Sequence, residues 1–439
     1  MRGSVPGWAR LSPPPVLSGD VTADAAALTG FAGETEAVLV GLPRRAQRSA
    51  AEQAVADGAF AACRGVREEF LRLHVEAVYD AVTGDRTRLV RVPELLADAS
   101  IAVPGLVPTE EQLAEERANT QGHKEGREID QGIFLRAVLR SPTAGGHLVL
   151  AMRQPTGRAL DLLAGFAESG AVDLGSVRVC RRGPAGHVTL HNTDSLNAED
   201  EAFVDDLETA VDLVLLDDRI HVGVLRGGVM THERYAGRRV FSAGVNLRLL
   251  QRGRVSFVDF AIRRELGYTS KIVHGLPSTM GKPWVAAVDS FAIGGCLEAL
   301  LGCDRVIAER DAYFAVPDGV VPAVAPFRLG RMAGGRQARR LVLSGGRIAA
   351  TDPAADLVCD QVVPPEGMSE AIEAAVRELD TPAAAANRAM VAHIEEPADR
   401  FRAYLAEFAY HQAARLYGRD VIARIDREWA HRGAAIGKR

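Results

Sequence analysis

Cysteine is scarce in this sequence, and its spacing argues against two kinds of site. The five cysteines are scattered without a CxxC pair, so neither a disulfide framework nor a zinc site is indicated. No HExxH pair offers zinc ligands either. GxSxG, Walker A and GxGxxG patterns are also absent. We therefore expect no metal, nucleotide-phosphate or flavin site.

Long apolar runs and a strong excess of charge are missing too. No stretch approaches the ~18 residues of a membrane-spanning helix, and the first twenty residues lack the apolar run of a signal peptide. A net charge of −5 and a pI near 6.2 favour neither nucleic acid nor a membrane surface as a partner. With 47% hydrophobic residues, the composition predicts a globular cytoplasmic protein.

The pattern of residues changes along the chain and predicts four segments. Residues 1–30 are rich in Pro and Gly, which predicts a flexible N-terminus. Residues 31–172 follow helical spacing, with a capping box at Thr109 to Gln112 and a helix stop at Gly84. Residues 173–375 alternate strands and helices after a β-hairpin, which predicts a mostly parallel sheet. Residues 376–439 return to helical spacing. We expect an α/β core between two helical segments.

Two glycine turns in the α/β region predict a site that binds an oxygen anion. The run Val285 to Val288 is followed by Gly294 and Gly295 and then by a helix, whose first N–H groups are unpaired and lie at the positive end of the helix dipole. A second turn, Phe241 to Leu247, follows another apolar run. Two converging N–H donors stabilise a thioester enolate or a tetrahedral adduct. The alternative is that both are packing turns.

Together these turns resemble the crotonase (enoyl-CoA hydratase/isomerase) superfamily. The turn at Phe241 to Leu247 has the family's form AG-x-[DN]-[LI]. The turn that begins at Gly294 follows the family's form GGG-x-E/Q except for its third residue, and the two turns occur in the family's order. The resemblance implies a crotonase-like ββα spiral core and an oxyanion hole made by the N–H groups of Val245 and Gly295. It also implies a homo-oligomer, either a trimer or a hexamer.

A narrower resemblance covers nearly the whole chain. GREIDQGIFLRAVLRSP (126–142), LNAEDEAFVDDLETAVDL (196–213), GVLRGGVMTHERYAGRRVFSAGVNL (223–247) and RRELGY (263–268) look like the 3,5-dihydroxyphenylacetyl-CoA 1,2-dioxygenase branch of the superfamily. That branch implies an arylacetyl-CoA substrate, O₂ as co-substrate, no cofactor, and an arylglyoxylate and free CoA as products. It also implies a place in glycopeptide-type antibiotic biosynthesis.

The same resemblance assigns three side chains to the ring of the substrate. Glu199 and Arg264 match residues that contact a dihydroxyphenyl group, and Glu298 stands where the branch has a glutamine. Each also has an ordinary interpretation. Glu199 falls at the start of a helix predicted from Glu199 to Leu216, where an acid stabilises the helix dipole. Arg264 and Glu265 are adjacent, which is typical of a surface ion pair. Glu298 sits among apolar residues, which predicts a buried carboxyl with a shifted pKa.

The chain also departs from the branch. Cys296 replaces the third glycine, and we expect a buried packing residue there rather than an acidified nucleophile. The segment between His274 and Lys282 is short, and so is the one at 317–322, where Asp318 is either a displaced second acid or a turn residue. Arg238 and Arg239 are candidates for the CoA phosphates, or else a solvated pair of arginines.

Two other functions fit the same sequence. Glu298 restores the acid that hydratases use as a base, so a hydratase, isomerase or thioesterase with Glu298 as acid/base, assisted by Asp318, is one alternative. A catalytically silent homologue is the other, because Cys296 and the short loops alter the surroundings of the hole.

Overall fold

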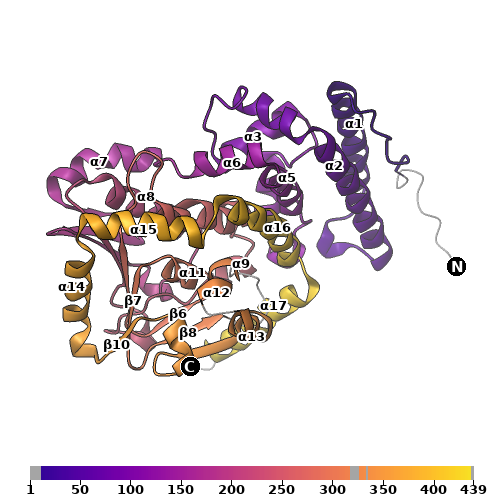
Figure 1. Ribbon diagram of the computed structural model, residues 1–439. Coiled ribbons are helices and arrows are strands. Elements are labelled where there is room, and N and C mark those ends of the chain that lie inside the picture. Colours follow the sequence, from indigo (N-terminus) through magenta and orange to yellow (C-terminus); the bar gives the residue numbers. More distant parts are fainter. Residues whose placement is uncertain (1–10, 317–325, 333–334, 437–439) are drawn as a thin grey trace. The chain divides into compact units, whose positions relative to one another are not determined.

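The computed structural model describes residues 11–316, 326–332 and 335–436 (Figure 1). The chain divides into two compact units. Unit 1 takes its described residues from Met1–Ala151, Gln251–Arg254 and Arg402–Arg439, and unit 2 consists of Met152–Leu250 and Val255–Phe401. No helix in the described part of the chain is long and apolar enough to cross a membrane.

Unit 1 is helical, as the sequence predicted. Its longest helix, α2, begins with a capping box between Ser49 and Glu52 and ends at Gly84, whose left-handed φ of 60° closes the helix. The capping box at Thr109 and Gln112 is confirmed. Residues 21–30, predicted to be flexible, belong to helix α1 instead, because Asp20 caps its first turn. The helices of this unit are α1 (Val21–Val40), α2 (Ala50–Thr83), α3 (Val92–Ala102), α4 (Glu110–Arg117), α5 (Glu128–Arg140), α6 (Pro142–Met152), α16 (Ala398–Leu416, which begins in unit 2) and α17 (Arg419–Ile436).

Unit 2 contains a seven-stranded sheet of order β1-β2-β3-β4-β5-β7-β10. The predicted hairpin is confirmed, since Val177 pairs with Leu190 across β2 and β3. The pairs from β3 to β10 are parallel, in agreement with the predicted sheet. The strands are β1 (Ala171–Asp173), β2 (Val177–Arg182), β3 (Ala185–Leu190), β4 (Val222–Gly227), β5 (Trp284–Val288), β7 (Arg305–Glu309) and β10 (Gln361–Val363).

A three-stranded sheet of order β6-β8-β9 completes the strands of unit 2. Strands β6 (Phe291–Ile293) and β8 (Tyr313–Val316) are parallel, and β9 (Gly346–Ala349) is antiparallel to β8. Along the chain, β5, β6 and helix α11 (Gly295–Leu301) form a ββα unit, and β7, β8 and α12 (Pro326–Met332) form another. This repetition is the ββα arrangement that the resemblance to the crotonase superfamily implies.

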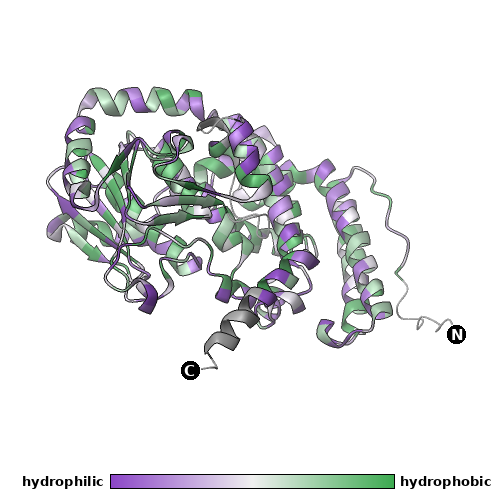
Figure 2. Cartoon of the chain, turned by 90° about the horizontal axis from the view of Figure 1, so that it is seen from below, coloured by the Kyte–Doolittle hydropathy of each residue, from purple (hydrophilic) through white to green (hydrophobic). Residues whose placement is uncertain are grey.

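Helices pack on the seven-stranded sheet because its strands bury apolar side chains. Alternate residues of β4 and β5, including Val222, Val224 and Val285, form one core with the apolar face of α14. Helix α8 packs against β2 and β3. Figure 2 shows these strands as mostly hydrophobic, whereas the helices alternate between hydrophobic and hydrophilic residues. The remaining helices of the unit are α7 (Gly157–Ser169), α8 (Glu201–Leu216), α9 (Leu247–Gln251), α10 (Ser270–His274), α13 (Gly335–Ser344), α14 (Met368–Leu379) and α15 (Pro382–Glu395).

Candidate active site

The two glycine turns lie side by side in unit 2. Ser242 and Ala292 form a parallel bridge, Ser242 N donates to Phe291 O, and Ile293 N donates to Ser242 O. The two segments stay close beyond this bridge, because a Cβ built on Gly294 would lie 3.5 Å from Gly244 Cα. Val245 and Gly295 are the next residues of the two segments.

Glycine is needed where the two turns approach most closely. Gly244 and Gly294 have φ values of 80° and 69°, which side chains rarely adopt. A Cβ built on Gly244 would lie 3.0 Å from Ile293 O. The positive φ of Gly294 turns the chain from β6 into the first turn of α11.

The N–H groups of both predicted donors are available to a ligand. Glu199 N donates to Gly244 O and Asn246 N donates to Glu199 O, so the N–H of Val245 between them points away from Glu199. Gly295 opens α11, where N–H groups have no partner within the helix. Within the described residues neither N–H donates a hydrogen bond. These two N–H groups are the donors that the resemblance predicts for an oxyanion hole.

Glu199 and Arg264 lie directly beside the second turn. Both side chains are fully buried, and Arg264 Nη1 is 3.5 Å from Glu199 Oε2. A Cβ built on Gly295 would come within 2.1 Å of Arg264 Nη1 and 2.5 Å of Glu199 Oε2. The structure therefore brings together Val245, Gly295, Glu199 and Arg264.

The ordinary interpretations of Glu199 and Arg264 are wrong. Helix α8 begins at Glu201 and is capped by Asp200, so Glu199 precedes the helix and does not serve its dipole. Arg264 does pair with Glu265, at 2.9 Å, but both side chains have no exposure to solvent, so this is not a surface ion pair. Burial raises the pKa of Glu199 despite the nearby Arg264.

Cys296 is buried next to Glu199 and Ser242, and burial raises the pKa of its thiol well above the ordinary value. A thiolate nucleophile requires a lowered pKa, so the structure agrees with a packing residue.

Tyr268 is a further member of the cluster that sequence reasoning missed. It is fully buried among Glu199, Cys296 and Arg264, and its hydroxyl has no hydrogen-bond partner among the described residues.

Glu298 lies one helical turn after Gly295 and is fully buried, as predicted. Neither of its carboxyl oxygens has a hydrogen-bond partner in the described part of the chain. Burial and the nearby carboxylate of Glu265 raise its pKa well above the ordinary value. The closest cation is Arg328, whose Nη1 is 3.6 Å from Glu298 Oε2.

The other predicted site residues are not placed in this cluster. Arg238 is exposed, and its guanidinium lies 5.9 Å from the ring centre of Tyr235. Arg239 Nη1 donates to Gly227 O at 2.9 Å. Asp318 lies outside the described residues. No group of three or more His, Cys, Asp or Glu residues that could hold a metal occurs within the described ranges.

Arg264, Glu265 and Tyr268 lie around a kink in the chain. The segment Glu265–Thr269 is interrupted at Gly267, whose φ of −88° and ψ of −113° are not helical, and it follows a π-helical turn at Val258–Ile262. The motif RRELGY contains all three residues, but helical spacing alone does not predict the kink. For Arg328 on α12 we find no signal in the sequence.

The chain is similar to known proteins over most of its length. The enoyl-CoA hydratase/isomerase family model matches residues 184–413. The chain is 51% identical over 421 residues to (3,5-dihydroxyphenyl)acetyl-CoA 1,2-dioxygenase of Amycolatopsis orientalis, which covers 94% of this chain and 97% of that protein. It is 28% identical over 193 residues to a probable enoyl-CoA hydratase of Rhizobium meliloti, covering 43% of this chain and 69% of the relative.

Among solved structures, an enoyl-CoA hydratase/isomerase from Xanthobacter autotrophicus matches with a TM-score of 0.50 and 22% identity, covering 60% of this chain and 96% of that one. This likeness supports the fold. From the family model and the full-length relative, the chain belongs to the enoyl-CoA hydratase/isomerase family, the crotonase superfamily.

Proposed function

We propose that this protein is a cofactor-independent dioxygenase that converts an arylacetyl-CoA of the 3,5-dihydroxyphenyl type, with O₂, to an arylglyoxylate and free CoA. The observation that carries the proposal is the 51% identity over 94% of the chain to an enzyme of that name. The family model covers residues 184–413 only, so the longer match also includes the helical N-terminal region that ordinary family members lack.

The first requirement of this reaction is a stable thioester enolate. The N–H groups of Val245 and Gly295 would donate to the thioester oxygen, where negative charge grows as the α-carbon loses its proton. Donors already fixed by the backbone favour the enolate because they need little reorganisation during the reaction. The parallel bridge at Ser242 and Ala292 holds the two turns in place.

The second requirement is recognition of the ring. Glu199 is fully buried and lies 3.5 Å from Arg264 Nη1, but its oxygens make no well-aligned hydrogen bond among the described residues. Such a buried carboxyl gains from a further donor, which a phenolic hydroxyl of the substrate would supply. Arg264 lies beside Gly295, and Tyr268 is buried near Glu199 and Arg264. The cluster therefore suits a ring that carries hydroxyl groups.

The oxygen step follows from the enolate. The carbanion transfers electrons to O₂ and forms a C–O bond, which gives a peroxide at the α-carbon. The distal peroxide oxygen attacks the thioester carbonyl, and the thiolate of CoA leaves. Cleavage of the O–O bond, with loss of the remaining α-hydrogen as a proton, leaves the ketone and the carboxylate of the arylglyoxylate. The two α-hydrogens leave as protons, and both atoms of O₂ enter the product.

The test is oxygen uptake and CoA release by the full-length protein after exhaustive metal removal, with residual metal measured. With 3,5-dihydroxyphenylacetyl-CoA we expect one O₂ consumed for each CoA released. Phenylacetyl-CoA, without ring hydroxyls, serves as the matched substrate and should react more slowly. The proposal is rejected if no arylacetyl thioester in a panel supports uptake.

A second candidate activity is hydration or isomerisation of an acyl-CoA with Glu298 as acid/base. The buried carboxyl with two unpartnered oxygens in the described part of the chain favours it, because a group with a raised pKa can accept and return a proton near neutral pH. An assay with crotonyl-CoA under nitrogen measures this activity separately from oxygen chemistry.

We also propose a cytoplasmic homo-oligomer, a trimer or hexamer, that binds acyl-CoA and acts in glycopeptide-type antibiotic biosynthesis. Membership of the crotonase superfamily supports the oligomer, and the match to the Amycolatopsis orientalis enzyme supports the biosynthetic role. We place the CoA phosphates near Arg238 and Arg239, which shortly precede Val245 in the sequence. Light scattering with and without an acyl-CoA would test the assembly.

A further inference from the structure

A continuous row of buried charges leads away from the candidate ring-binding residues. Arg264 lies between Glu199, at 3.5 Å, and Glu265, at 2.9 Å. Glu265 Oε2 is 3.3 Å from Arg328 Nη1, and Arg328 Nη2 is 2.7 Å from Glu396 Oε1. All of these side chains are at most 4% exposed.

Arg328 is the point at which three carboxyl groups meet. It makes two hydrogen bonds to Glu396, from Nε at 2.8 Å and from Nη2 at 2.7 Å, a bidentate geometry that fixes the guanidinium plane. Its third nitrogen, Nη1, is shared by Glu265 at 3.3 Å and Glu298 at 3.6 Å. The ring of Phe401 lies 5.1 Å from the guanidinium carbon. Rotation of Arg328 would disturb all of these contacts.

The number of charges in the row makes Arg328 important for Glu298. Four carboxyl groups, those of Glu199, Glu265, Glu298 and Glu396, face two arginines, Arg264 and Arg328. Arg153 adds a third positive charge near Glu396, which still leaves one carboxylate uncompensated. His274 Nε2 lies 3.2 Å from Glu396 at the outer end. A buried site does not tolerate a large uncompensated charge, so at least one carboxyl must hold a proton when His274 is neutral. Glu298 accepts no hydrogen bond within the described residues and is a good candidate to hold it.

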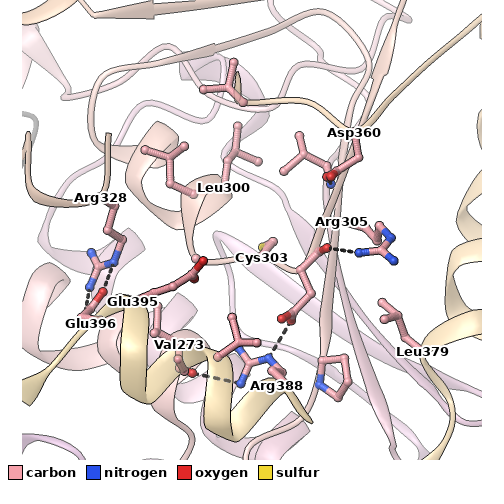
Figure 3. A pocket seen from close by; sticks show the side chains of 18 of the residues that line it. Val273, Leu300, Cys303, Arg305, Arg328, Asp360, Leu379, Arg388, Glu395 and Glu396 are labelled. Atoms are coloured by element: carbon pink, nitrogen blue, oxygen red, sulfur yellow. Dashed lines mark hydrogen bonds and ion pairs between the residues drawn. The ribbon is translucent and has the colours of Figure 1, made fainter. Parts of the chain in front are cut away.

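Arg328 does not belong to the group that contacts Gly295. A cavity of about 740 Å³ is lined by Arg328 and Glu396, together with Leu300, Cys303 and Arg388, and its lining includes neither Glu199 nor Arg264. Figure 3 shows the Arg328–Glu396 pair at one end of this cavity. Arg328 is connected to the ring-binding pair through Glu265.

We propose that Arg328 is a positioning residue for ring recognition: it holds Glu265 so that Glu265 fixes Arg264, and it provides the cation that faces the uncharged carboxyl of Glu298. This inference rests on the proposed function, because it assigns Arg264 and Glu298 to the substrate pocket. The direction of the pKa shifts agrees with the geometry. Burial and Glu265 raise the pKa of Glu298, and Arg328 opposes that rise. Glu396 has its pKa lowered to about 2 because Arg328 and His274 outweigh the effect of burial.

The experiment compares Arg328→Met, Arg328→Lys and the control Arg388→Met. Arg388 is also buried in unit 2, where it pairs with Asp304 at 2.6 Å and donates to Val273 O at 2.9 Å. Its ion pair and hydrogen bonds within the described residues go to groups outside the row of charges. Figure 3 shows both arginines around the same cavity. Loss of either arginine should lower the melting temperature, so stability alone does not separate them.

The deciding quantity is the ratio of kcat/KM for 3,5-dihydroxyphenylacetyl-CoA to that for phenylacetyl-CoA, measured across pH. We expect Arg328→Met to lower this ratio by roughly 10- to 100-fold, since small displacements of positioned groups have effects of that size. Its pH profile should also shift toward higher pH, because Glu298 loses its nearest cation. Arg328→Lys keeps the positive charge, so its pH profile should resemble that of the wild type. Its ratio of kcat/KM values should lie between those of the wild type and Arg328→Met. Arg388→Met should keep both the ratio and the profile of the wild type.

The outcomes distinguish this inference from the proposed function. If the wild type consumes no O₂ with any arylacetyl-CoA, the proposed function fails, and the inference is then judged by ligand-induced changes in melting temperature with the same two thioesters. If wild type and Arg328→Met show the same ratio, or the same difference in thermal shift, Arg328 has no positioning role. If Arg328→Met does not fold, Arg328→Lys decides alone: a wild-type ratio overturns the inference and a lowered ratio supports it.

Discussion

The guanidinium of Arg264 occupies the space that a side chain at position 295 would need. A Cβ on Gly295 would lie 2.1 Å from Arg264 Nη1 and 2.5 Å from Glu199 Oε2. Glycine is required here because Arg264 and Glu199, which we propose bind the ring, pass next to the Cα atom. One residue couples the proposed oxyanion hole to ring recognition.

We therefore predict that Gly295→Ala lowers kcat by about 10²- to 10³-fold, the usual effect of losing one oxyanion donor. The methyl group must push away Arg264 or shift the turn itself. Oxygen uptake with CoA release measures the loss. Gly165→Ala in α7 is the matched control, because nothing lies within 4 Å of a Cβ there; it should keep full activity. Wild-type kcat in Gly295→Ala would contradict the proposed hole.

The second prediction concerns Glu298→Gln. A dioxygenase should keep or improve its rate with this variant, because the neutral amide matches both the glutamine of the resembling branch and an uncharged carboxyl. A hydratase that uses Glu298 as its base should lose most of its rate instead. Oxygen uptake and crotonyl-CoA hydration, assayed in parallel, separate the two. Glu366→Gln, at an exposed position, is the control.

The same variant carries a prediction about stability. The pKa of Glu298 is raised in the folded state from an ordinary value of 4.5, so the folded protein binds this proton more tightly than the unfolded chain. The stabilisation is complete below pH 4.5 and is lost as the pH rises toward the folded-state pKa. Glu298→Gln should therefore raise the melting temperature at a pH of about 7 and not at a pH of about 4, on either side of the ordinary carboxyl pKa. A lower melting temperature near neutral pH would contradict the assignment.

Much of this site is predictable from short stretches of sequence. The turns around Val245 and Gly295, the hairpin and the helix stop at Gly84 depend on local backbone preferences, which the residues themselves report. The burial of Glu298 was predictable because its neighbours in α11 are apolar. These features need no knowledge of the tertiary fold.

Other features depend on contacts between distant segments. Glu199 looked like a helix-start acid because its neighbours suit a cap, but Asp200 takes that position and leaves Glu199 facing Arg264. Arg264 and Glu265 have the appearance of a surface pair, but both side chains have no exposure to solvent and lie next to the kink at Gly267. Arg328 meets Glu396 across 68 residues of chain, a contact that no local pattern indicates.

The third prediction tests ring recognition by Glu199→Gln. We expect a higher KM for 3,5-dihydroxyphenylacetyl-CoA, by roughly tenfold, because the amide replaces one strong acceptor and a charge-assisted hydrogen bond contributes about 1.5–3 kcal/mol. Phenylacetyl-CoA has no ring hydroxyl, so its KM should change little. Steady-state oxygen uptake with both substrates measures the difference. Equal changes with the two thioesters would show that Glu199 does not bind a ring hydroxyl.

The fourth prediction concerns Cys296. Its buried thiol has a raised pKa, so the folded protein should not be inactivated by iodoacetamide at neutral pH, and Cys180, which is partly exposed, should be alkylated first. Cys296→Gly restores the third glycine of the family turn and should keep activity within a few fold. Mass spectrometry of alkylated peptides gives the order of labelling. A nucleophilic cysteine would instead react early, and its replacement would abolish turnover.

The last prediction concerns a second buried cluster, in which Lys271 Nζ lies 2.8 Å from both Glu208 and Asp212. All three side chains have no exposure to solvent, so Lys271→Met would remove the cation next to Asp212 and leave Glu208 with Arg263, at 3.5 Å. Removing one partner of a buried ion pair costs about 3–5 kcal/mol, and chemical denaturation should show a loss of that size.

Burial and Glu208 raise the pKa of Asp212, whereas Lys271 opposes the rise, so Asp212 should take up a proton more readily in the variant. The double variant Lys271→Met with Asp212→Asn should therefore recover part of the lost stability, while Arg336→Met, at an exposed position of α13, should cost little. If the double variant is less stable than Lys271→Met, the uncompensated charge is not the cause of the loss.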